Sequence, residues 1–541
     1  MYIKINDVRI PIEMFKDQAQ EQEILKGIVT KKLKVAKSDI KQLKIIKESV
    51  DARRKGKITF VYALGVTLYG DEKKVVRHLQ HRNVQYVKQE DIVPLKKGTQ
   101  KLITRPIIIG TGPAGLFAGL ILASEGYNPL LVERGDDVHQ RTEKVHDFWK
   151  GQKLDPDSNV QFGEGGAGTF SDGKLTTRIH DRRGEKVLQA FVDAGAPREI
   201  LYRAKPHIGT DRLKKVVENM RNQIYALGGE VRFNAKLTDI YIKNDKISGI
   251  EVNSGEYLPC DVLLLAIGHS ARDTYEMLLQ RELKMVQKPF SMGVRIEHNQ
   301  QDIDAIQYGS YAGHPKLKAA EYQLVYKQKD RTCYSFCMCP GGVVVAAASE
   351  PKSIVTNGMS EFARDRENAN SALVVSVGPN DFEGSHPLSG VAFQRRWEHL
   401  AYVAGGENGA APVQYVGDFL NVCPSTVLKD KGIKPSYTGK VHPTDLTKCL
   451  PSFVTDTMQN GLRYFDNKIK GYADPNVIMT GVETRTSAPI RMPRTEDGQS
   501  VSIQGVYPAG EGAGYAGGIV SAAVDGIRIA ELVMQKHAPL V

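Results

Sequence analysis

The segment PIIIGTGPAG, residues 106–115, joins a short apolar run to a glycine-rich turn. Pro106–Ile109 predicts a buried strand, and the apolar residues of Ala114–Ser124 predict a helix that ends before Gly126. Pro129–Val132 predicts a second strand directly after it. The segment therefore predicts a strand-helix-strand unit of the kind that binds dinucleotides.

Each glycine of the turn has a separate predicted role. Gly110 permits a tight turn out of the strand, Gly112 lets the backbone approach a diphosphate, and Gly115 lets the helix pack closely against the sheet. Pro113 and Ala114 begin the helix, so the phosphates would meet the positive end of its dipole. All five residues are predicted to contact a cofactor.

Two charged residues end the second strand. Glu133 follows Gly115 by 18 residues, where a carboxylate can bind both ribose hydroxyls of an adenine nucleotide. An acid there disfavours a 2′-phosphorylated nucleotide but does not separate FAD from NAD. Arg134, beside it, is a further predicted cofactor contact.

A late glycine-rich segment favours FAD. The residues GVYPAGEGAGYAGG, 505–518, predict a strand and the start of a helix over 519–534. Amides at that start would lie near the flavin pyrimidine edge, where negative charge gathers on reduction. In flavoproteins of this kind, a further strand follows a β-meander. The segment DVLLLAIG, 261–268, predicts that strand. The cofactor contacts predicted here are Gly268, Gly510, Glu511, Gly517, Gly518 and Ile519.

Several of these segments together carry a resemblance to a known family. The chain is similar to the two-dinucleotide-fold flavoproteins of the glutathione-reductase superfamily, and most similar to bacterial FAD-dependent dehydrogenases, often called NAD-utilising, whose substrates are generally unassigned. The matching segments are residues 107–134, 162–175, 336–350, 483–494 and 507–526. The resemblance implies FAD as cofactor and an unidentified small molecule as substrate. Where the superfamily has Gly-Asp for the ribityl chain, this sequence has Gly510-Glu511.

The sequence contains only one N-terminal nucleotide fingerprint, which is the segment that begins at residue 106. Enzymes of the glutathione-reductase type carry a second one for NAD(P)H, so we expect NAD(P)H, if used, to bind transiently over the flavin. The expected architecture resembles the hydroxybenzoate-hydroxylase branch, in which a middle region forms a substrate domain. The fold class predicted is α/β: a Rossmann-like FAD domain of the two-dinucleotide type, an inserted mixed β-sheet substrate domain and a small N-terminal ferredoxin-like domain.

The loop Phe162–Leu175 contains five glycines. Dense glycine usually serves close backbone approach, so Gly165, Gly166 and Lys174 are predicted to contact the cofactor. A flexible surface loop is the alternative.

Candidates for the chemistry itself are few. Cys337 and Cys339 would share one face of a strand and could act as redox thiols near the flavin, although buried cysteine often serves only as a small hydrophobe. His269 and His442 are possible proton donors, with a structural role as the alternative.

Three arginines fall in the segment RTSAPIRMPR. Arg485, Arg491 and Arg494 could bind an anionic substrate, because a guanidinium suits planar anions. Surface ion pairs would explain them equally well.

Charge distribution suggests a domain boundary near residue 100. Residues 1–105 contain 24 Lys and Arg against 12 Asp and Glu, whereas the remainder contains 49 against 50. The predicted domains are a basic α/β domain over 1–100, FAD-binding parts over 101–283 and 476–541, and a substrate domain over 284–475. The basic domain leaves open an RNA-associated flavoprotein of the tRNA-modifying type, although no aromatic-rich binding motif accompanies the charge. A non-catalytic FAD-binding scaffold is a third possibility.

Composition narrows the class of protein further. The sequence is 41% hydrophobic and 25% charged, as in ordinary globular proteins, and contains neither a membrane-length apolar run nor a signal peptide. Its six cysteines follow no disulfide or zinc pattern. We therefore expect a cytoplasmic protein with reduced thiols and no metal site.

Overall fold

The computed structural model describes residues 1–15, 19–54, 56–88, 95–177 and 179–540. The chain divides into two compact units. The first unit comprises Met1–Pro94, Pro197–Pro206 and Gln301–Ala320, and the second comprises Leu95–Ala196, His207–Gln300 and Glu321–Val541. Two short segments from the middle of the sequence thus fold with the N-terminal region.

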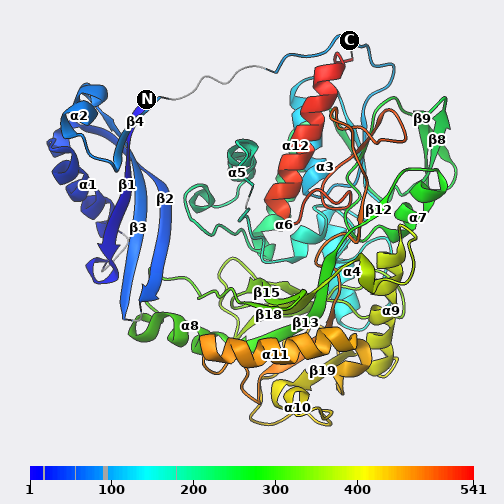
Figure 1. Cartoon of the computed structure of the whole chain (residues 1–541). Helices are drawn as coiled ribbons and strands as arrows, with labels where there is room; N and C mark the ends of the chain where they lie inside the picture. The colour runs from blue at the N-terminus through cyan, green and yellow to red at the C-terminus, as the bar shows by residue number, and fades with distance from the viewer. Residues whose placement is uncertain (16–18, 55, 89–94, 178, 541) are drawn as a thin grey trace. The chain divides into compact units, whose positions relative to one another are not determined.

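The first unit contains an antiparallel sheet, the two helices that connect its strands, and most of the helix α8 (Gln300–Tyr308) (Figure 1). Its strand order is β2-β3-β1-β4, so the outer strands are the second and the fourth. The order of elements along the chain is the strand-helix-strand-strand-helix-strand pattern of a split β-α-β unit. The elements are β1 (Tyr2–Pro11), α1 (Ala19–Leu33), β2 (Ile40–Arg54), β3 (Lys57–Leu68), α2 (Glu72–Leu79) and β4 (Val84–Val87).

Alternation of apolar residues explains this sheet. In β1 and β3, every second side chain is buried over most of the strand, and these side chains form one core with Leu25 and Val29 of α1. The segment 301–320 adds Lys316, whose ammonium lies 4.7 Å from the centre of the Phe15 ring and 2.7 Å from a Glu21 carboxylate oxygen. A cation–π contact and an ion pair therefore hold this distant segment on the first unit.

A parallel sheet organises the nucleotide-binding part of the second unit. Its strand order is β23-β11-β5-β6-β7, and each neighbouring pair is parallel. The three central strands are buried along their full length, as expected for a sheet covered on both faces. The strands are β5 (Ile107–Ile109), β6 (Leu130–Val132), β7 (Glu230–Arg232), β11 (Leu263–Leu265) and β23 (Val506–Pro508).

A β-meander covers one face of the parallel sheet. Ile107, Leu130 and Leu263 from the sheet share a buried cluster with Ile240 and Ile250 from the meander. The meander consists of β8 (Leu237–Lys243), β9 (Lys246–Val252) and β10 (Glu256–Pro259), in the order β10-β9-β8.

Helices accompany the parallel sheet. In Figure 1, α12 lies alongside α3, and the two helices are in extensive contact. The helix α3 also contacts α6 and the strands β5 and β6. The helices of this region are α3 (Pro113–Ser124), α4 (Val138–Trp149), α5 (Arg183–Asp193), α6 (Thr210–Ala226), α7 (Arg272–Gln280) and α12 (Ile519–Lys536).

A larger mixed sheet forms the rest of the second unit. Its order is β14-β15-β18-β13-β21-β19-β20, and it is antiparallel except for the pair β19–β20. The helix α11 packs against β14, β15 and β18. The strands are β13 (Phe290–Asn299), β14 (Val325–Gln328), β15 (Arg331–Cys339), β18 (Asn368–Val377), β19 (Ala411–Tyr415), β20 (Val441–Pro443) and β21 (Ile478–Glu483). The helices of this part are α9 (Ser389–Ala404), α10 (Val416–Leu420) and α11 (Ser452–Lys468).

Two further strand pairs complete the second unit. They are β12 (Val286–Gln287) with β22 (Ile490–Arg491), and β16 (Val343–Ala346) with β17 (Thr356–Met359). Both pairs are antiparallel.

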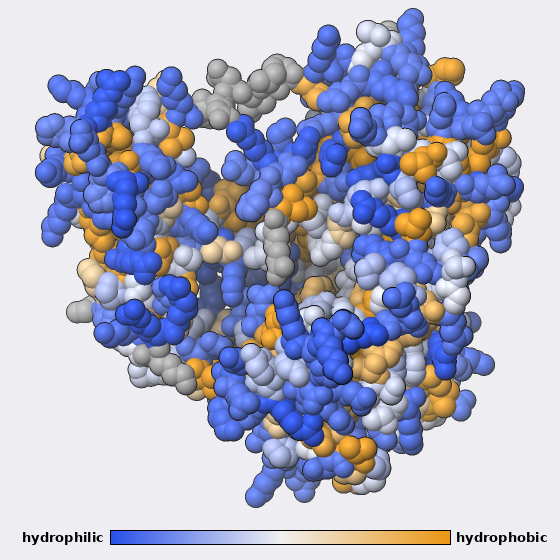
Figure 2. All heavy atoms as spheres, viewed as in Figure 1, coloured by the Kyte–Doolittle hydropathy of each residue, from blue (hydrophilic) through white to orange (hydrophobic). Residues whose placement is uncertain are grey.

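Hydrophilic side chains cover most of the surface visible in Figure 2, and hydrophobic ones appear in small separate groups. Among the described residues, none of the helices combines the length and apolar character needed to cross a membrane.

Candidate cofactor site

The turn after β5 has the backbone that its glycines permit. Gly110 has φ +97°, and a Cβ there would lie 2.5 Å from the Ala266 carbonyl oxygen. A Cβ on Gly115 would lie only 1.9 Å from the carbonyl oxygen of Gly110. Gly115 therefore lets α3 begin directly against its own turn, whereas Gly119 is the residue that packs closely on Leu131 of the sheet.

The first turn of α3 is open to an anion. Gly112 is the N-cap residue, and no side chain accepts a hydrogen bond from the helix start there. The first amides of a helix need external acceptors, and the helix dipole makes this end positive. The start of α3 therefore has the geometry of a phosphate-binding site.

The loop with five glycines packs on this turn. The Gly165 amide donates to the Thr111 carbonyl oxygen at 2.9 Å, and a Cβ on Gly166 would lie 3.0 Å from the Gly112 Cα. Gly163, Gly165 and Gly166 all have positive φ. Residues 161–165 are buried, so the structure contradicts the alternative of a flexible surface loop. A larger residue at 166 would fill the space beside the phosphate-binding turn.

Glu133 ties these glycine segments together. Its side chain is buried, and one carboxylate oxygen accepts hydrogen bonds from the Thr111 amide and hydroxyl at 2.9 and 2.7 Å. The other oxygen accepts from the Gly135 and Gly163 amides, both at 3.0 Å. A carboxylate has about four acceptor positions, and all four are used here. The contact of Glu133 with ribose stays a prediction, and the contact that the structure shows is with the loops.

The two predicted cationic contacts also have protein partners. The Arg134 guanidinium pairs with Asp157 and Asp273 at 2.5 and 2.8 Å and stacks over Phe162 at 4.2 Å. The Lys174 ammonium pairs with Asp172 at 2.8 Å and donates to the Met338 carbonyl oxygen. Both cations therefore hold loops of the site in place.

A second helix begins beside the first. Gly518 is the N-cap of α12 and has no side chain to cap the helix, while the Ser521 hydroxyl accepts a hydrogen bond from the Gly517 amide at 3.2 Å. A Cβ added to Gly517 would meet no atom within 4 Å, so the start of the helix is open. Gly510, in the loop before α12, has φ +73°, and a Cβ there would lie 2.7 Å from the Ala114 Cβ, so this loop packs closely on the start of α3.

Glu511 lies at the same end of the unit. Burial raises its pKa to about 7, while the positive charge of Lys288 acts in the opposite direction. The Tyr275 hydroxyl lies 2.9 Å from the carbonyl oxygens of both Gly268 and Gly512 and so joins the two segments beside Glu511. Tyr275 was not singled out from the sequence, because its position in the helix α7 looks like an ordinary core residue.

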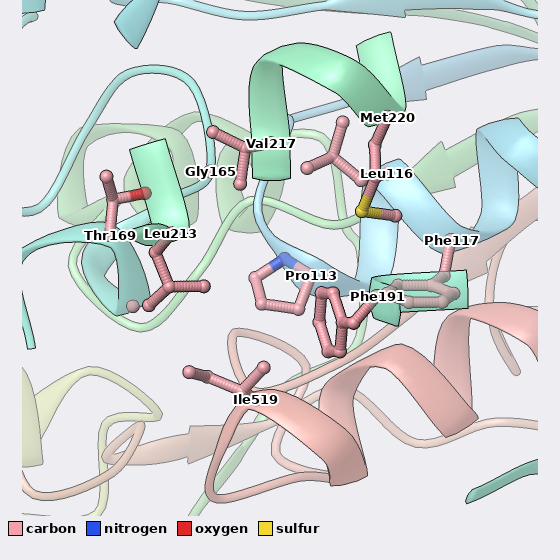
Figure 3. A pocket seen from close by; sticks show the side chains of 11 residues that line it. Pro113, Leu116, Phe117, Gly165, Thr169, Phe191, Leu213, Val217, Met220 and Ile519 are labelled. Atoms are coloured by element: carbon pink, nitrogen blue, oxygen red, sulfur yellow. The ribbon is translucent and has the colours of Figure 1, made fainter. Parts of the chain in front are cut away.

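An apolar pocket lies beside the two helix starts (Figure 3). Its side chains point toward one another from α3, α5, α6, the glycine loop and α12. The lining residues are Pro113, Leu116, Phe117, Gly165, Gly168, Thr169, Phe191, Leu213, Val217, Met220 and Ile519. This pocket suits an apolar group and provides no charge for a phosphate.

The two histidine candidates lie in different environments. His269 lies beside Arg485 and Arg272, and burial together with these positive charges lowers its pKa to about 3. Its imidazole is therefore neutral near pH 7 and bears no extra proton to donate. His442 is exposed on the edge strand β20.

The arginine candidates mostly form buried ion pairs. Arg485 and Arg272 both bind the fully buried Glu398, at 2.9 and 2.7 Å. Arg494 forms a two-bond pair with Asp525, with both distances 2.9 Å. Arg491 is exposed and stacks on an aromatic ring. Arg485 and Arg494 therefore form ion pairs, as the alternative interpretation expected, but these pairs are buried and not on the surface.

The cysteine candidates are brought together. Cys337 and Cys339 lie at the end of β15, where the Cys339 thiol donates to the Cys337 carbonyl oxygen at 3.3 Å, whereas Cys333 is buried against Gly461 of α11. Among the described residues, no group of three or more His, Cys, Asp or Glu side chains is arranged to hold a metal ion.

These features define a mixed α/β protein in which a glycine-rich turn joins the parallel sheet to the start of α3. The sequence is 50% identical over 538 residues to a protein of Clostridium beijerinckii named "Uncharacterized protein", and the match covers 99% of each chain. This chain belongs to the same family as that protein. Residues 289–486 match the family described as "FAD-dependent protein, C-terminal domain-like", and residues 2–67 match a domain of unknown function.

Solved structures give weaker likenesses. An L-proline dehydrogenase from P. horikoshii is 10% identical, with 81% of this chain and 94% of that chain covered and a TM-score of 0.34. A geranylgeranyl bacteriochlorophyll reductase-like protein from Thermoplasma acidophilum is 12% identical, with 80% and 78% covered and a TM-score of 0.35. At such low identities and TM-scores, these likenesses identify no activity for this chain.

Proposed function

We propose that this chain is an FAD-dependent oxidoreductase that acts on a small organic molecule. The single observation that carries the proposal is the pair of adjacent helix starts, α3 and α12, each begun by glycine and left uncapped by side chains. The match of residues 289–486 to an FAD-dependent family supports the choice of cofactor.

The residues at the site fit the chemistry of FAD. Side chains at positions 110, 115, 166 or 510 would fill the space along the turn and between the helices, and each position is glycine. The donors at the start of α3 match a diphosphate, and those at the start of α12 match the electron-rich pyrimidine edge of a flavin. The apolar pocket beside them suits an uncharged portion of a ligand.

Bound FAD would supply the hydride or electron chemistry of the reaction. The chain would contribute position and charge. The start of α3 would hold the diphosphate, and Glu133 would keep the turn and the glycine loop in register. Glu511, whose pKa is about 7, would hold or release a proton beside the start of α12.

The finer parts of the proposal concern the partners of the reaction. We propose membership of the glutathione-reductase superfamily, because residues 107–134 resemble its N-terminal nucleotide fingerprint, and we propose NAD(P)H as a transient co-substrate. The organic substrate would bind against the mixed sheet, in the part of the chain predicted as the substrate domain.

Anaerobic stopped-flow spectroscopy tests this proposal. Purified protein should show the absorbance of bound flavin, and NADH, NADPH or one member of a metabolite panel should bleach it. Protein that is colourless and does not bind added FAD would overturn the proposal. Bound flavin that neither nicotinamide reduces would remove only the NAD(P)H part.

A further inference from the structure

The strand β15 ends in an irregular segment that contains two cysteines. Cys337 has φ +44°, in the left-handed region that residues with a side chain rarely adopt, and the pairing register with β18 shifts between Phe336 and Cys339. Bulges and left-handed residues of this kind redirect side chains and are common at functional sites.

Two cations hold this bulge in place. The Arg295 guanidinium, which has no exposed surface, donates to the Cys337 carbonyl oxygen at 2.9 Å. The Lys174 ammonium donates to the carbonyl oxygen of Met338, the residue between the cysteines. Both cations also pair with carboxylates, Arg295 with Glu483 and Lys174 with Asp172, so their charges are partly compensated.

The two thiols are in different environments. Cys337 is partly accessible, whereas Cys339 is buried and its sulfur also lies 3.3 Å from the Cys337 carbonyl oxygen. The hydrogen bond from Cys339, together with the charges of Arg295 and Lys174, lowers the pKa of Cys337 to about 6, against the opposing effects of burial and Asp172. By contrast, burial raises the pKa of Cys260 to about 12. An accessible thiolate next to a buried thiol is the usual arrangement of a redox pair.

The pair lies beside the proposed flavin site. Lys174 belongs to the glycine loop that packs on the phosphate-binding turn. Glu511, next to Gly510, lies close enough to Cys337 that a thiolate there raises the Glu511 pKa. The glycine loop, assigned to the diphosphate, and the loop before α12, assigned to the flavin ring, therefore meet at the cysteine bulge.

We propose that Cys337 and Cys339 form a dithiol–disulfide pair that exchanges two electrons with bound FAD. In the oxidising direction, the two S–H bonds break, one S–S bond forms, and FAD takes up the two electrons and two protons. The reverse step regenerates both thiols and oxidised FAD. This role rests on the proposed function, because the flavin is the partner of the exchange.

Alkylation of the full-length protein tests the thiol chemistry without relying on the flavin. Iodoacetamide labelling over a range of pH should give a midpoint for Cys337 about two pH units below that of the exposed Cys423 in the same sample. Treatment with diamide should then protect Cys337 and Cys339 together, leave Cys423 reactive, and make the peptide that contains the pair lighter by two hydrogens.

A reductive titration tests the exchange with FAD. Diamide-treated wild-type protein should take up two electrons per flavin more than Cys337→Ser or Cys339→Ser, while the matched control Cys423→Ser should behave as wild type. Equal uptake in all four proteins, with no disulfide after diamide, would overturn the redox pair and leave the flavin proposal intact. Absence of flavin would overturn the proposed function, and with it the exchange, even if the labelling shows a reactive Cys337.

Discussion

Replacing Gly115 by alanine tests the anion-binding turn most sharply. The added Cβ would lie 1.9 Å from the Gly110 carbonyl oxygen, far inside normal contact, so the start of α3 must move by about 1 Å. Overpacking of this kind costs about 1–3 kcal/mol of unfolding free energy. The same movement misplaces amides that would bind the diphosphate. Loss of one hydrogen bond to a charged group, about 1.5–3 kcal/mol, would weaken FAD binding ten- to a hundredfold.

A matched substitution separates the turn from a general effect of alanine. Gly184 lies in the first turn of α5, has no atom within 4 Å of an added Cβ, and does not have positive φ. Gly184→Ala should keep the wild-type stability or gain up to about 1 kcal/mol. Urea unfolding and fluorescence titration with FAD measure both quantities. If Gly115→Ala bound FAD as tightly as Gly184→Ala, the assignment of the turn would be refuted.

Three further substitutions test other parts of the structure. Glu398→Gln leaves the buried Arg272 and Arg485 without their shared carboxylate and should cost about 3–5 kcal/mol in urea unfolding; a loss below about 1 kcal/mol would contradict the network. Because the pKa of Glu511 is raised to about 7 in the folded protein, protonation of this carboxyl stabilises the fold. The contribution is fully present below pH 4.5 and is lost as the pH rises through about 7. The unfolding free energy of wild type, relative to Glu511→Gln, should therefore fall by up to about 3 kcal/mol between pH 5 and pH 8, and a constant difference would refute the shift. Lys316→Met should destabilise the first unit by about 2 kcal/mol and speed hydrogen exchange in β3 but not in α12. Equal protection of the β3 amides in wild type and Lys316→Met would argue against the ring contact.

Local patterns predicted the elements of the first unit well. A small ferredoxin-like domain was expected over residues 1–100, and the elements β1, α1, β2, β3, α2 and β4 follow the order of that fold. Alternation and turn residues act within a few positions, so the sequence displays them. The placement of 197–206 and 301–320 on the same unit depends on contacts across hundreds of residues, which no local pattern contains.

The same distinction applies to the site. The glycines at 110, 112 and 115 have a recognisable spacing, and the structure gives them the expected turn. Glu133 was expected to face ribose, yet its four hydrogen bonds come from Thr111, Gly135 and Gly163. Those partners come from three separate segments, and their convergence follows only from the packed structure. For the same reason, alternation alone placed Cys337 on a regular strand and missed the bulge.

A crystal structure of the protein grown with FAD tests the central claim most directly. We expect density for the diphosphate against the first turn of α3, within hydrogen-bonding distance of the Gly115 amide, and for the flavin ring beside the start of α12. Density for FAD elsewhere, or crystals without it at saturating FAD, would contradict the account.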